Sequence, residues 1–199
     1  MVEARVPRGT FEALSTYVAM LEQEASRQNL VSQATLLAVW QRHILDSLQL
    51  LDMADRHGTW ADLGSGAGLP GLVIAIASDL PVILIEPRRR RAEFLQQVVD
   101  QLALATRVTV IARRSEVVRI DEPAIVSARA VAPLEQLFAM AAPFATRATQ
   151  WILPKGRTAA DEVAIARQTW QGRFELVPSV TEPGSIIVVA RDIHRRGHP

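Results

Sequence analysis

The 199-residue chain contains no cysteine, and only one of its 22 basic residues, Lys155, is a lysine. The absence of cysteine excludes disulfides, thiolate metal ligands and cysteine nucleophiles, and it fits a reducing compartment. No apolar run approaches the roughly 20 residues that a membrane-spanning helix needs, and the first residues lack the apolar segment of a signal peptide. These absences predict a cytoplasmic protein without a membrane segment.

Charge is almost balanced, with 22 basic against 21 acidic residues, which excludes a uniformly basic nucleic-acid coat. The charges are nevertheless spread unevenly. Residues 86–119 hold eight arginines and four acidic residues, a local charge of +4, whereas residues 1–57 hold five arginines and seven acidic residues, a local charge of −2. The middle of the chain therefore supplies the expected basic surface.

The first 57 residues have a helical pattern and form an expected N-terminal helical extension. Thr10 is a suitable cap for a first helix, because apolar residues recur after it at three- and four-residue steps. Its apolar positions are Phe11, Leu14, Val18, Leu21 and Ala25, and those of a second helical stretch are Leu37, Trp40, Ile44, Leu48 and Leu51.

From Trp60 onward, short apolar runs alternate with longer helical segments, a pattern typical of an α/β fold with a mostly parallel sheet. We expect one Rossmann-like domain over residues 58–192, a terminal hairpin around residues 182–184, and a frayed tail over 193–199. The expected strands are 60–63, 82–85, 108–111, 124–127, 151–153, 174–180 and 185–190. The expected helices begin near residue 70, open with residues 88–91 after Glu86, and span 158–170.

The strongest chemical signal is the glycine-rich loop after the first expected strand, Asp62-Leu63-Gly64-Ser65-Gly66-Ala67-Gly68-Leu69-Pro70-Gly71. Glycines allow positive φ and a close approach of backbone to ligand, and a helix starting near Pro70 would direct its amides into the same space. A simple strand-to-helix turn would need one glycine rather than four. The loop therefore predicts a nucleotide-like ligand.

Two readings of the glycines compete. A frame that starts at Gly66 matches the G-x-G-x-x-G of NAD-dependent dehydrogenases, whereas a frame that starts at Gly64 gives D-x-G-x-G-x-G with Asp62 at the end of the strand. A carboxylate there suits a positively charged ligand, and Glu86 at the end of the second strand can accept hydrogen bonds from ribose hydroxyls. The second frame favours S-adenosylmethionine over NAD.

These residues resemble a known family, the bacterial 16S rRNA guanine-N7 methyltransferases of the G type, also called glucose-inhibited division protein B. Besides the glycine loop, the resemblance rests on Asn29-Leu30, Arg42-His43-Ile44-Leu45-Asp46-Ser47, Ser127-Ala128-Arg129-Ala130-Val131-Ala132 and Lys155-Gly156. It implies a class I S-adenosylmethionine-dependent methyltransferase fold, a seven-stranded sheet ending in a hairpin and preceded by helices. It also implies an enzyme that methylates 16S rRNA in the small ribosomal subunit or its precursor.

Carried over to this chain, the resemblance implies that Gly64 and Leu69 contact the cofactor and that Ser115 and Glu116 flank the adenine. It also implies that Arg129 lies at the cofactor and substrate side. The full expected cofactor set is Asp62, Gly64, Gly66, Gly68, Leu69, Glu86, Ser115, Glu116 and Arg129. No residue is required as an acid or base, because guanine N7 already carries a free lone pair. His43, Asp46, Arg129 and Lys155 are the candidates on the substrate side.

Arginines supply the expected RNA surface, namely Arg88, Arg89, Arg90 and Arg91 with Arg113, Arg114 and Lys155. His43 with Asp46 and Ser47 has the residue types of a catalytic triad, but neighbours on one helix offer no oxyanion site, so a structural or substrate-side role is expected. The histidines at 43, 57, 194 and 198 show no metal-ligand spacing beyond the pair His194 and His198, and no metal is expected.

Three alternatives remain open at this point: a methyltransferase acting on another RNA, on a small molecule or on a protein; a cofactor-binding ribosome assembly factor without turnover; and a dehydrogenase. An acidic or apolar rim in place of the arginines would favour a different methylation substrate. The intact Asp62, Gly64, Gly66 and Glu86 argue against loss of turnover. The sequence leaves the oligomeric state open and favours a monomer.

Overall fold

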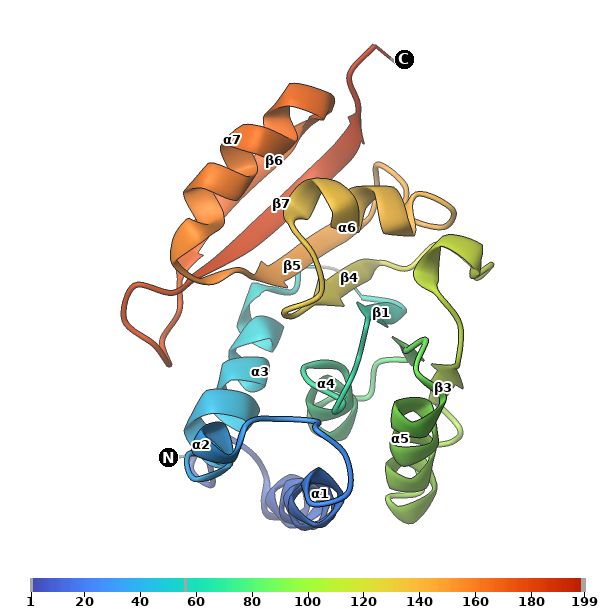
Figure 1. Ribbon diagram of the computed structural model, residues 1–199, viewed down its shortest axis with the longest axis vertical. Helices are drawn as coiled ribbons and strands as arrows, with labels where there is room; N and C mark the ends of the chain where they lie inside the picture. Colours follow the sequence, from blue (N-terminus) through green and yellow to red (C-terminus); the bar gives the residue numbers. More distant parts are fainter. Residues whose placement is uncertain (1, 56, 198–199) are drawn as a thin grey trace.

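Seven strands form one sheet in the order β3-β2-β1-β4-β5-β7-β6 (Figure 1). The computed structural model describes residues 2–55 and 57–197. Strands β1 to β5 are parallel, whereas β7 runs antiparallel to both β5 and β6. The expected mostly parallel sheet with a terminal antiparallel hairpin is confirmed. The strands are β1 (Trp60–Leu63), β2 (Val82–Ile85), β3 (Val108–Ile111), β4 (Ile125–Ala128), β5 (Gln150–Pro154), β6 (Trp170–Pro178) and β7 (Ile186–Arg195).

Helices cover both faces of the sheet. In Figure 1, α1, α4 and α5 lie below the sheet together with a helical segment from Trp40 to Met53, and α6 and α7 lie above it. That segment is continuous but irregular, consisting of a π-helix η1 (Trp40–Leu45), α3 (Asp46–Leu48) and a 3-10 turn η2 (Gln49–Met53). The other helices are α1 (Arg8–Ala25), α2 (Gln33–Leu36), α4 (Gly71–Ala77), α5 (Arg89–Gln101), α6 (Leu134–Ala141) and α7 (Ala159–Thr169), with short turns η3 (Ser115–Val117) and η4 (Gly156–Thr158).

Two hydrophobic cores follow from the alternation of side chains along the strands. Trp60 points into the core under α4 and α5, and its neighbour Ala61 points into the core under α6 and α7. The short strands of the sheet centre are buried on both faces, which is why they read as nearly continuous apolar runs. Asp62 shares the face of Trp60, since it lies two residues further along the same strand.

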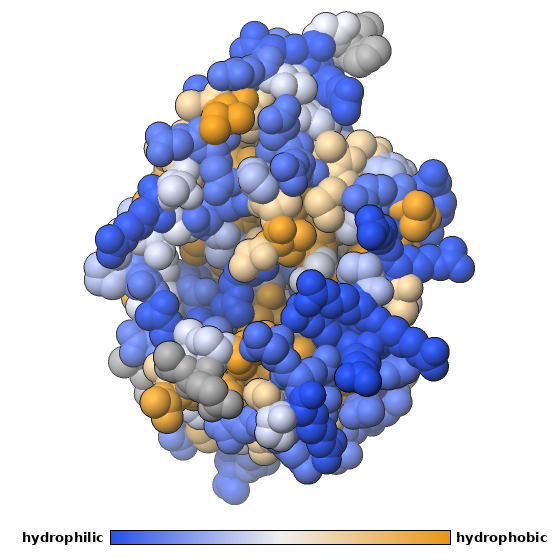
Figure 2. Space-filling model, in the orientation of Figure 1, coloured by the Kyte–Doolittle hydropathy of each residue, from blue (hydrophilic) through white to orange (hydrophobic). Residues whose placement is uncertain are grey.

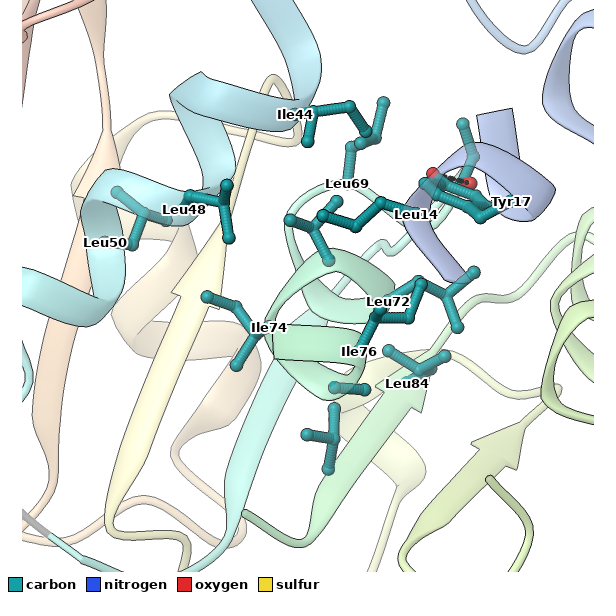
Figure 3. Packing of buried hydrophobic residues seen from close by; sticks show 14 of the residues in the cluster. Leu14, Tyr17, Ile44, Leu48, Leu50, Leu69, Leu72, Ile74, Ile76 and Leu84 are labelled. Atoms are coloured by element: carbon teal, nitrogen blue, oxygen red, sulfur yellow. Dashed lines mark hydrogen bonds between the residues drawn. The ribbon is translucent and has the colours of Figure 1, made fainter. Parts of the chain in front are cut away.

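The N-terminal helices pack directly on α4 and share the core of the sheet. Figure 3 shows Leu72 and Ile74 of α4 among Leu14 from α1 and Ile44 and Leu48 from the Trp40–Met53 segment. All five side chains are buried. Burial of a leucine or isoleucine contributes about 1.5–3 kcal/mol, so this contact fixes the N-terminal helices against the glycine loop that precedes α4.

The start of the first helix differs from the sequence expectation. It begins at Arg8 after Pro7, and Thr10 lies inside the helix instead of capping it. Pro7 makes no side-chain cap, but its carbonyl accepts the backbone N–H of Phe11 at 3.0 Å. A proline next to the first turn is favourable because its missing N–H would have no partner there, and this competing signal was stronger than a threonine cap.

The second helical stretch is not the regular helix that its apolar spacing predicts. Leu37, expected on the buried stripe, is 94 % exposed, whereas Ile44 and Leu48 are buried as expected. The chain turns after α2, and η1 is a wider π-helix, so residues before Trp40 leave the 3.6-residue period.

The strand boundaries shift most at the end of the chain. β4 begins and ends one residue later than expected, and β6 begins at Trp170, where a helix was expected to end. Residues 193–195, placed in the frayed tail, are the end of β7, because Ile193 is buried and Arg195 pairs with Trp170. Residues 198–199 of the expected tail lie outside the described residues.

Candidate functional site

The glycine loop lies between β1 and α4, at the carboxyl edge of the parallel strands. Gly64, Gly66 and Gly68 all have positive φ, at 61°, 56° and 95°. The backbone N–H of Gly66 donates to Glu86 Oε2 at 2.8 Å, which ties the loop to the end of β2. From the other side, the buried Tyr17 hydroxyl of α1 donates to the Ala67 carbonyl at 2.8 Å. The loop is thus fixed between two elements at the sheet edge, and most of its amides donate within the protein, including those of Ser65, Gly68 and Leu69.

The other expected cofactor residues of this edge lie where the parallel strands end. Glu86 is buried, and its second oxygen, Oε1, accepts the backbone N–H of Arg88 at 2.8 Å. Ser115 is buried and Glu116 is exposed in the turn η3 that follows β3. The side chain of Leu69 is buried in the core near Ile44 (Figure 3), so its side chain has a packing role.

Asp62 does not face the ligand side of the loop, and this corrects the sequence expectation. Its side chain is fully buried, with Oδ1 accepting from the Ser127 hydroxyl at 2.6 Å and Oδ2 accepting from the Gly71 N–H at 3.2 Å. The carboxylate therefore connects β1, β4 and the start of α4. The parity of the strand explains the difference, because Asp62 points to the same face as Trp60 and so toward α4.

Replacing Asp62 with asparagine is expected to remove a loss of folding stability that wild type suffers as pH rises. Burial raises the pKa of Asp62 to about 6 from its ordinary 3.8, so the folded protein keeps a proton that the unfolded chain releases. The stability that this proton contributes is complete below the unfolded pKa and is lost as pH rises through the folded pKa, about 3 kcal/mol in all. Urea unfolding at about pH 4 and about pH 7 should show Asp62→Asn gaining on wild type by up to that amount.

The comparison must be made as variant minus wild type, because His43 has the opposite effect. Burial, and then the neighbouring Arg129, lower the pKa of His43 from 6.5 to about 4, so stability from its neutral form is lost as pH falls through that range. The two contributions oppose each other in wild type. A difference between Asp62→Asn and wild type that stays constant with pH would contradict the raised pKa.

Arg129 is the centre of a second cluster, located just after β4. Its guanidinium donates to the Asp46 carboxylate at 3.4 Å, to the Arg42 carbonyl at 3.3 Å and to His43 Nδ1 at 3.2 Å. Because a guanidinium carries only donors, Nδ1 of His43 must be the acceptor and the ring proton lies on Nε2. The cluster thus joins the N-terminal segment to the sheet, and a neutral His43 is one of the three hydrogen-bond acceptors of Arg129.

Lys155 is placed at the same side of the molecule but not at its surface. The side chain is 8 % exposed, and its ammonium donates to the Ala132 carbonyl at 2.6 Å and pairs with Glu162 at 2.9 Å. Its charge is therefore already matched within the protein. The expectation that Lys155 extends the RNA-binding surface is corrected, since a buried ammonium with two partners inside the protein is a poor free ligand for phosphate.

A cavity of about 630 Å³ brings the four substrate-side candidates together. His43, Asp46, Arg129 and Lys155 all line it, although they come from the N-terminal segment and from the ends of β4 and β5. Its remaining wall includes the turn 179–185 between β6 and β7. This volume is ample for a purine base, and ligand cavities of α/β folds lie at the same carboxyl edge.

A family model described as rRNA small subunit methyltransferase G matches residues 10–184. A protein of that name from Rhizorhabdus wittichii is 45% identical over 199 residues, covering 98% of this chain and 92% of its own. Its counterpart from Erythrobacter litoralis is 46% identical over 192 residues, covering 96% and 92%.

The chain belongs to the rRNA small subunit methyltransferase G family. The resemblance seen in the sequence is thereby confirmed. Solved structures agree on the fold of this family member. A mutant of MtNAS in complex with S-adenosylmethionine gives a TM-score of 0.61 at 15% identity, covering 92% of this chain and 76% of that one. M. jannaschii TYW2 in complex with AdoMet gives 0.57 at 14% identity, covering 77% and 76%.

In this methyltransferase G family member, the arginines of residues 88–91 are not equivalent. Arg88, Arg89 and Arg90 are exposed, and strongly hydrophilic side chains gather over the region of α5 in Figure 2. Arg91 is half-buried, with Nη2 donating to the Asn29 carbonyl at 3.0 Å. Arg91 is therefore engaged within the protein, while the exposed Arg113 and Arg114 could extend the same basic surface.

Two further expectations concern metals and membranes. Over residues 2–55 and 57–197, no group of three or more histidine or acidic side chains is arranged to hold a metal ion. Within the same ranges, none of the helices has the length and apolarity needed to cross a bilayer. His198, one of the two histidines considered as a pair, lies outside the described residues.

Sequence reasoning missed the part of the site that comes from the C-terminal hairpin. Ser179, Thr181 and Glu182 line the cavity, and Gln49 lies behind them with hydrogen bonds to this turn. None belongs to a recognisable motif. Their position depends on the antiparallel return of β7 beside β5, which brings the hairpin turn to the N-terminal segment about 130 residues away in sequence.

Proposed function

We propose that this protein transfers a methyl group from S-adenosylmethionine to N7 of a guanine in 16S rRNA, within the small ribosomal subunit or its precursor. The observation that carries the proposal is the adjacency of two sites at one sheet edge. The glycine loop and Glu86 end β1 and β2, and Arg129 ends β4 at a cavity that can take a purine. Membership of the methyltransferase G family supports the choice of reaction and RNA.

The residues present fit S-adenosylmethionine. A Cβ on Gly66 would meet the Gly64 carbonyl oxygen at 3.6 Å and Arg91 Nη1 at 3.7 Å, which are ordinary van der Waals distances, so no protein group packs tightly against this glycine. Each oxygen of Glu86 accepts one backbone N–H and retains a lone pair that can accept a ribose hydroxyl. We propose that the backbone of the glycine loop, Glu86, Ser115 and Glu116 bind the cofactor, which when bound supplies an electrophilic methyl group on a sulfonium.

The reaction asks the protein for orientation rather than proton transfer. Guanine N7 is unprotonated at neutral pH and has an in-plane lone pair, so no general base is required. The state of His43 agrees with this, because its Nδ1 lone pair is occupied by Arg129 and its lowered pKa keeps it neutral. Alignment of two reacting groups can supply up to about 7–11 kcal/mol in favourable intramolecular systems.

The target guanine must leave a regular helix to react. N7 lies on the major-groove edge of the base, which side chains do not reach in an A-form RNA helix. A loop or distorted segment is therefore the expected substrate, and we propose that the base enters the cavity beside Arg129. Extruding a base costs a few kcal/mol, least where it is already unpaired.

Exposed arginines at the start of α5 are expected to bind RNA phosphates. Replacing Arg88, Arg89 and Arg90 together with glutamine should weaken binding and lower the slope of log affinity against log salt by roughly two to three, if each contacts one phosphate. Cofactor affinity should not change. Arg91 is left intact because it contacts Asn29 next to the glycine loop. Filter binding at several salt concentrations measures the slope.

The matched control removes three exposed arginines from elsewhere, Arg8, Arg167 and Arg196. The net charge then changes equally, but the α5 surface stays intact. An equal loss of slope in both triple variants would mean that RNA responds only to total charge, and an unchanged slope in the first would place the RNA surface elsewhere.

The decisive experiment on the function itself has two steps. The purified protein is titrated by calorimetry with S-adenosylmethionine and with NAD, and is then incubated with cofactor and small subunits from cells that lack this gene. Formation of N7-methylguanine in 16S rRNA is the expected result. Transfer to a different RNA, a protein or a small molecule would change the substrate, binding without transfer would favour an assembly factor, and selective NAD binding would overturn the cofactor.

A further inference from the structure

Gln49 is a buried polar side chain that lies outside the glycine loop and does not contact Arg129 itself. It is the first residue of η2 and is 1 % exposed. Its Nε2 donates to Asp46 Oδ1 at 2.8 Å and to the Ser179 hydroxyl at 3.2 Å, and its Oε1 accepts the Val180 N–H at 2.9 Å. One amide group therefore connects the N-terminal helical segment with the turn 179–185.

The same two segments are joined directly through Asp46. The Thr181 hydroxyl donates to Asp46 Oδ1 at 2.6 Å, the oxygen that also accepts from Gln49. The other oxygen, Oδ2, is the one that contacts Arg129. Gln49 and Thr181 thus fix one side of this carboxylate and leave the other side directed at the arginine.

Both segments form one wall of the substrate cavity. Asp46, Ser179 and Thr181 line it, whereas Gln49 lies behind the wall and does not. Two exposed links also join the segments, an ion pair of Arg42 with Glu182 at 2.8 Å and a hydrogen bond from Gln41 Nε2 to the Thr181 carbonyl at 3.4 Å. Exposed links contribute little because water competes for both partners, whereas an unmatched buried amide is costly, so the buried link dominates.

We propose that Gln49 is a positioning residue for the RNA substrate: it sets Asp46 and the turn 179–185 as one rigid wall of the cavity that receives the target base. The inference rests on the function proposed above, because it needs a base in that cavity. Gln49 touches neither RNA nor cofactor in this assignment. It acts through Asp46, whose orientation in turn fixes Arg129.

The test compares Gln49→Leu with a matched control, Gln150→Leu. Gln150 is also fully buried and also connects the N-terminal part to the sheet, since Nε2 donates to the Met53 carbonyl at 2.7 Å and Oε1 accepts the Asp55 N–H at 3.1 Å. It lies at the amino end of β5, away from the cavity. Melting temperature, cofactor Kd, and kcat and KM with small subunits are measured for each.

Both variants should lose stability, because each removes the hydrogen bonds of a buried amide and leaves its backbone partners without that side chain. Only Gln49→Leu should raise KM for subunits, by about tenfold or more, with the cofactor Kd unchanged. A second pair of variants, at Thr181, tests the same role even if Gln49→Leu does not fold. Thr181→Val removes the hydroxyl that contacts Asp46 and should raise the KM for subunits. Thr181→Ser retains the hydroxyl, so its KM should be close to that of wild type.

The outcomes separate this inference from the function on which it rests. If wild type methylates subunits but Gln49→Leu and Gln150→Leu have the same KM, or if Thr181→Val keeps the wild-type KM, the positioning role is overturned and the function stands. A wild type that binds S-adenosylmethionine but methylates no subunit overturns both.

Discussion

Replacing Gly66 with alanine should lower cofactor affinity by roughly 30-fold or more, which corresponds to about 2 kcal/mol, while the protein still folds. Two effects add. Gly66 has a φ of 56°, a left-handed conformation that costs an L-residue about 1–2 kcal/mol, so the loop would relax from its present shape. The added methyl would also stand on the part of the loop that we propose contacts the cofactor, while its protein contacts, 3.6 Å to the Gly64 carbonyl oxygen and 3.7 Å to Arg91 Nη1, are ordinary van der Waals distances. Calorimetric titration with S-adenosylmethionine measures the loss.

Substitutions at the neighbouring glycines would not separate a loss of cofactor binding from a loss of folding. A Cβ on Gly64 would lie 2.7 Å from Val131 Cγ2, and one on Gly68 would lie 2.3 Å from Leu72 Cδ1. Substitution there forces the core to move, so lost binding would report damage to the fold. Gly66 is the position where binding and folding can be separated.

Gly156→Ala is the matched control for the backbone cost. Gly156 has a φ of 72° and no atom within 4 Å of an added Cβ, but it lies after β5, outside the glycine loop. It should lose similar stability and bind cofactor as wild type does. Equal affinities for wild type and Gly66→Ala would show that the ligand does not use this loop.

The central sheet was predictable because each strand carries its own signal. The runs at β1, β2 and β3 match the observed strands residue for residue. β1 and β2 need nearly continuous apolar runs because both of their faces are covered, whereas the edge strand β3 is marked by its β-branched residues although Thr109 is exposed. The outer hairpin was less predictable. β6 is partly exposed and alternates in burial, so Trp170 could be assigned equally to the end of a helix or the start of a strand.

The candidate site divides in the same way. The glycine loop and Glu86 could be predicted because their residue types and spacing are recognisable in the sequence. The structure brings the two together. Asp62 belongs to that motif, but its role depends on which face of β1 it occupies, and it proved to be a buried link to Ser127 and α4. Gln49 and Thr181 belong to no recognisable sequence motif, because they acquire their hydrogen-bond partners only when the hairpin folds against the N-terminal segment.

Replacing Arg129 with alanine should reduce kcat/KM for subunits by on the order of 100-fold or more, with a smaller loss of stability. Arg129 joins the end of β4, the N-terminal segment and the cavity. Its contacts with Asp46 and His43 use two nitrogens of one planar fork, which an ammonium cannot reproduce. Arg129→Lys should therefore restore little activity. Single-turnover methyl transfer to subunits measures the effect.

A spectroscopic signature distinguishes loss of this contact from general damage. Arg129 is the second cause, after burial, of the lowered pKa of His43, so Arg129→Ala should raise that pKa from about 4 toward 6.5 in an NMR titration. The control is Arg147→Ala, which breaks an exposed ion pair with Asp192 far from the cavity and should change neither quantity. Full activity in Arg129→Ala would show that the reacting base does not depend on this cluster. Lost activity with an unchanged His43 pKa would mean that Arg129 acts on the substrate without the histidine as its partner.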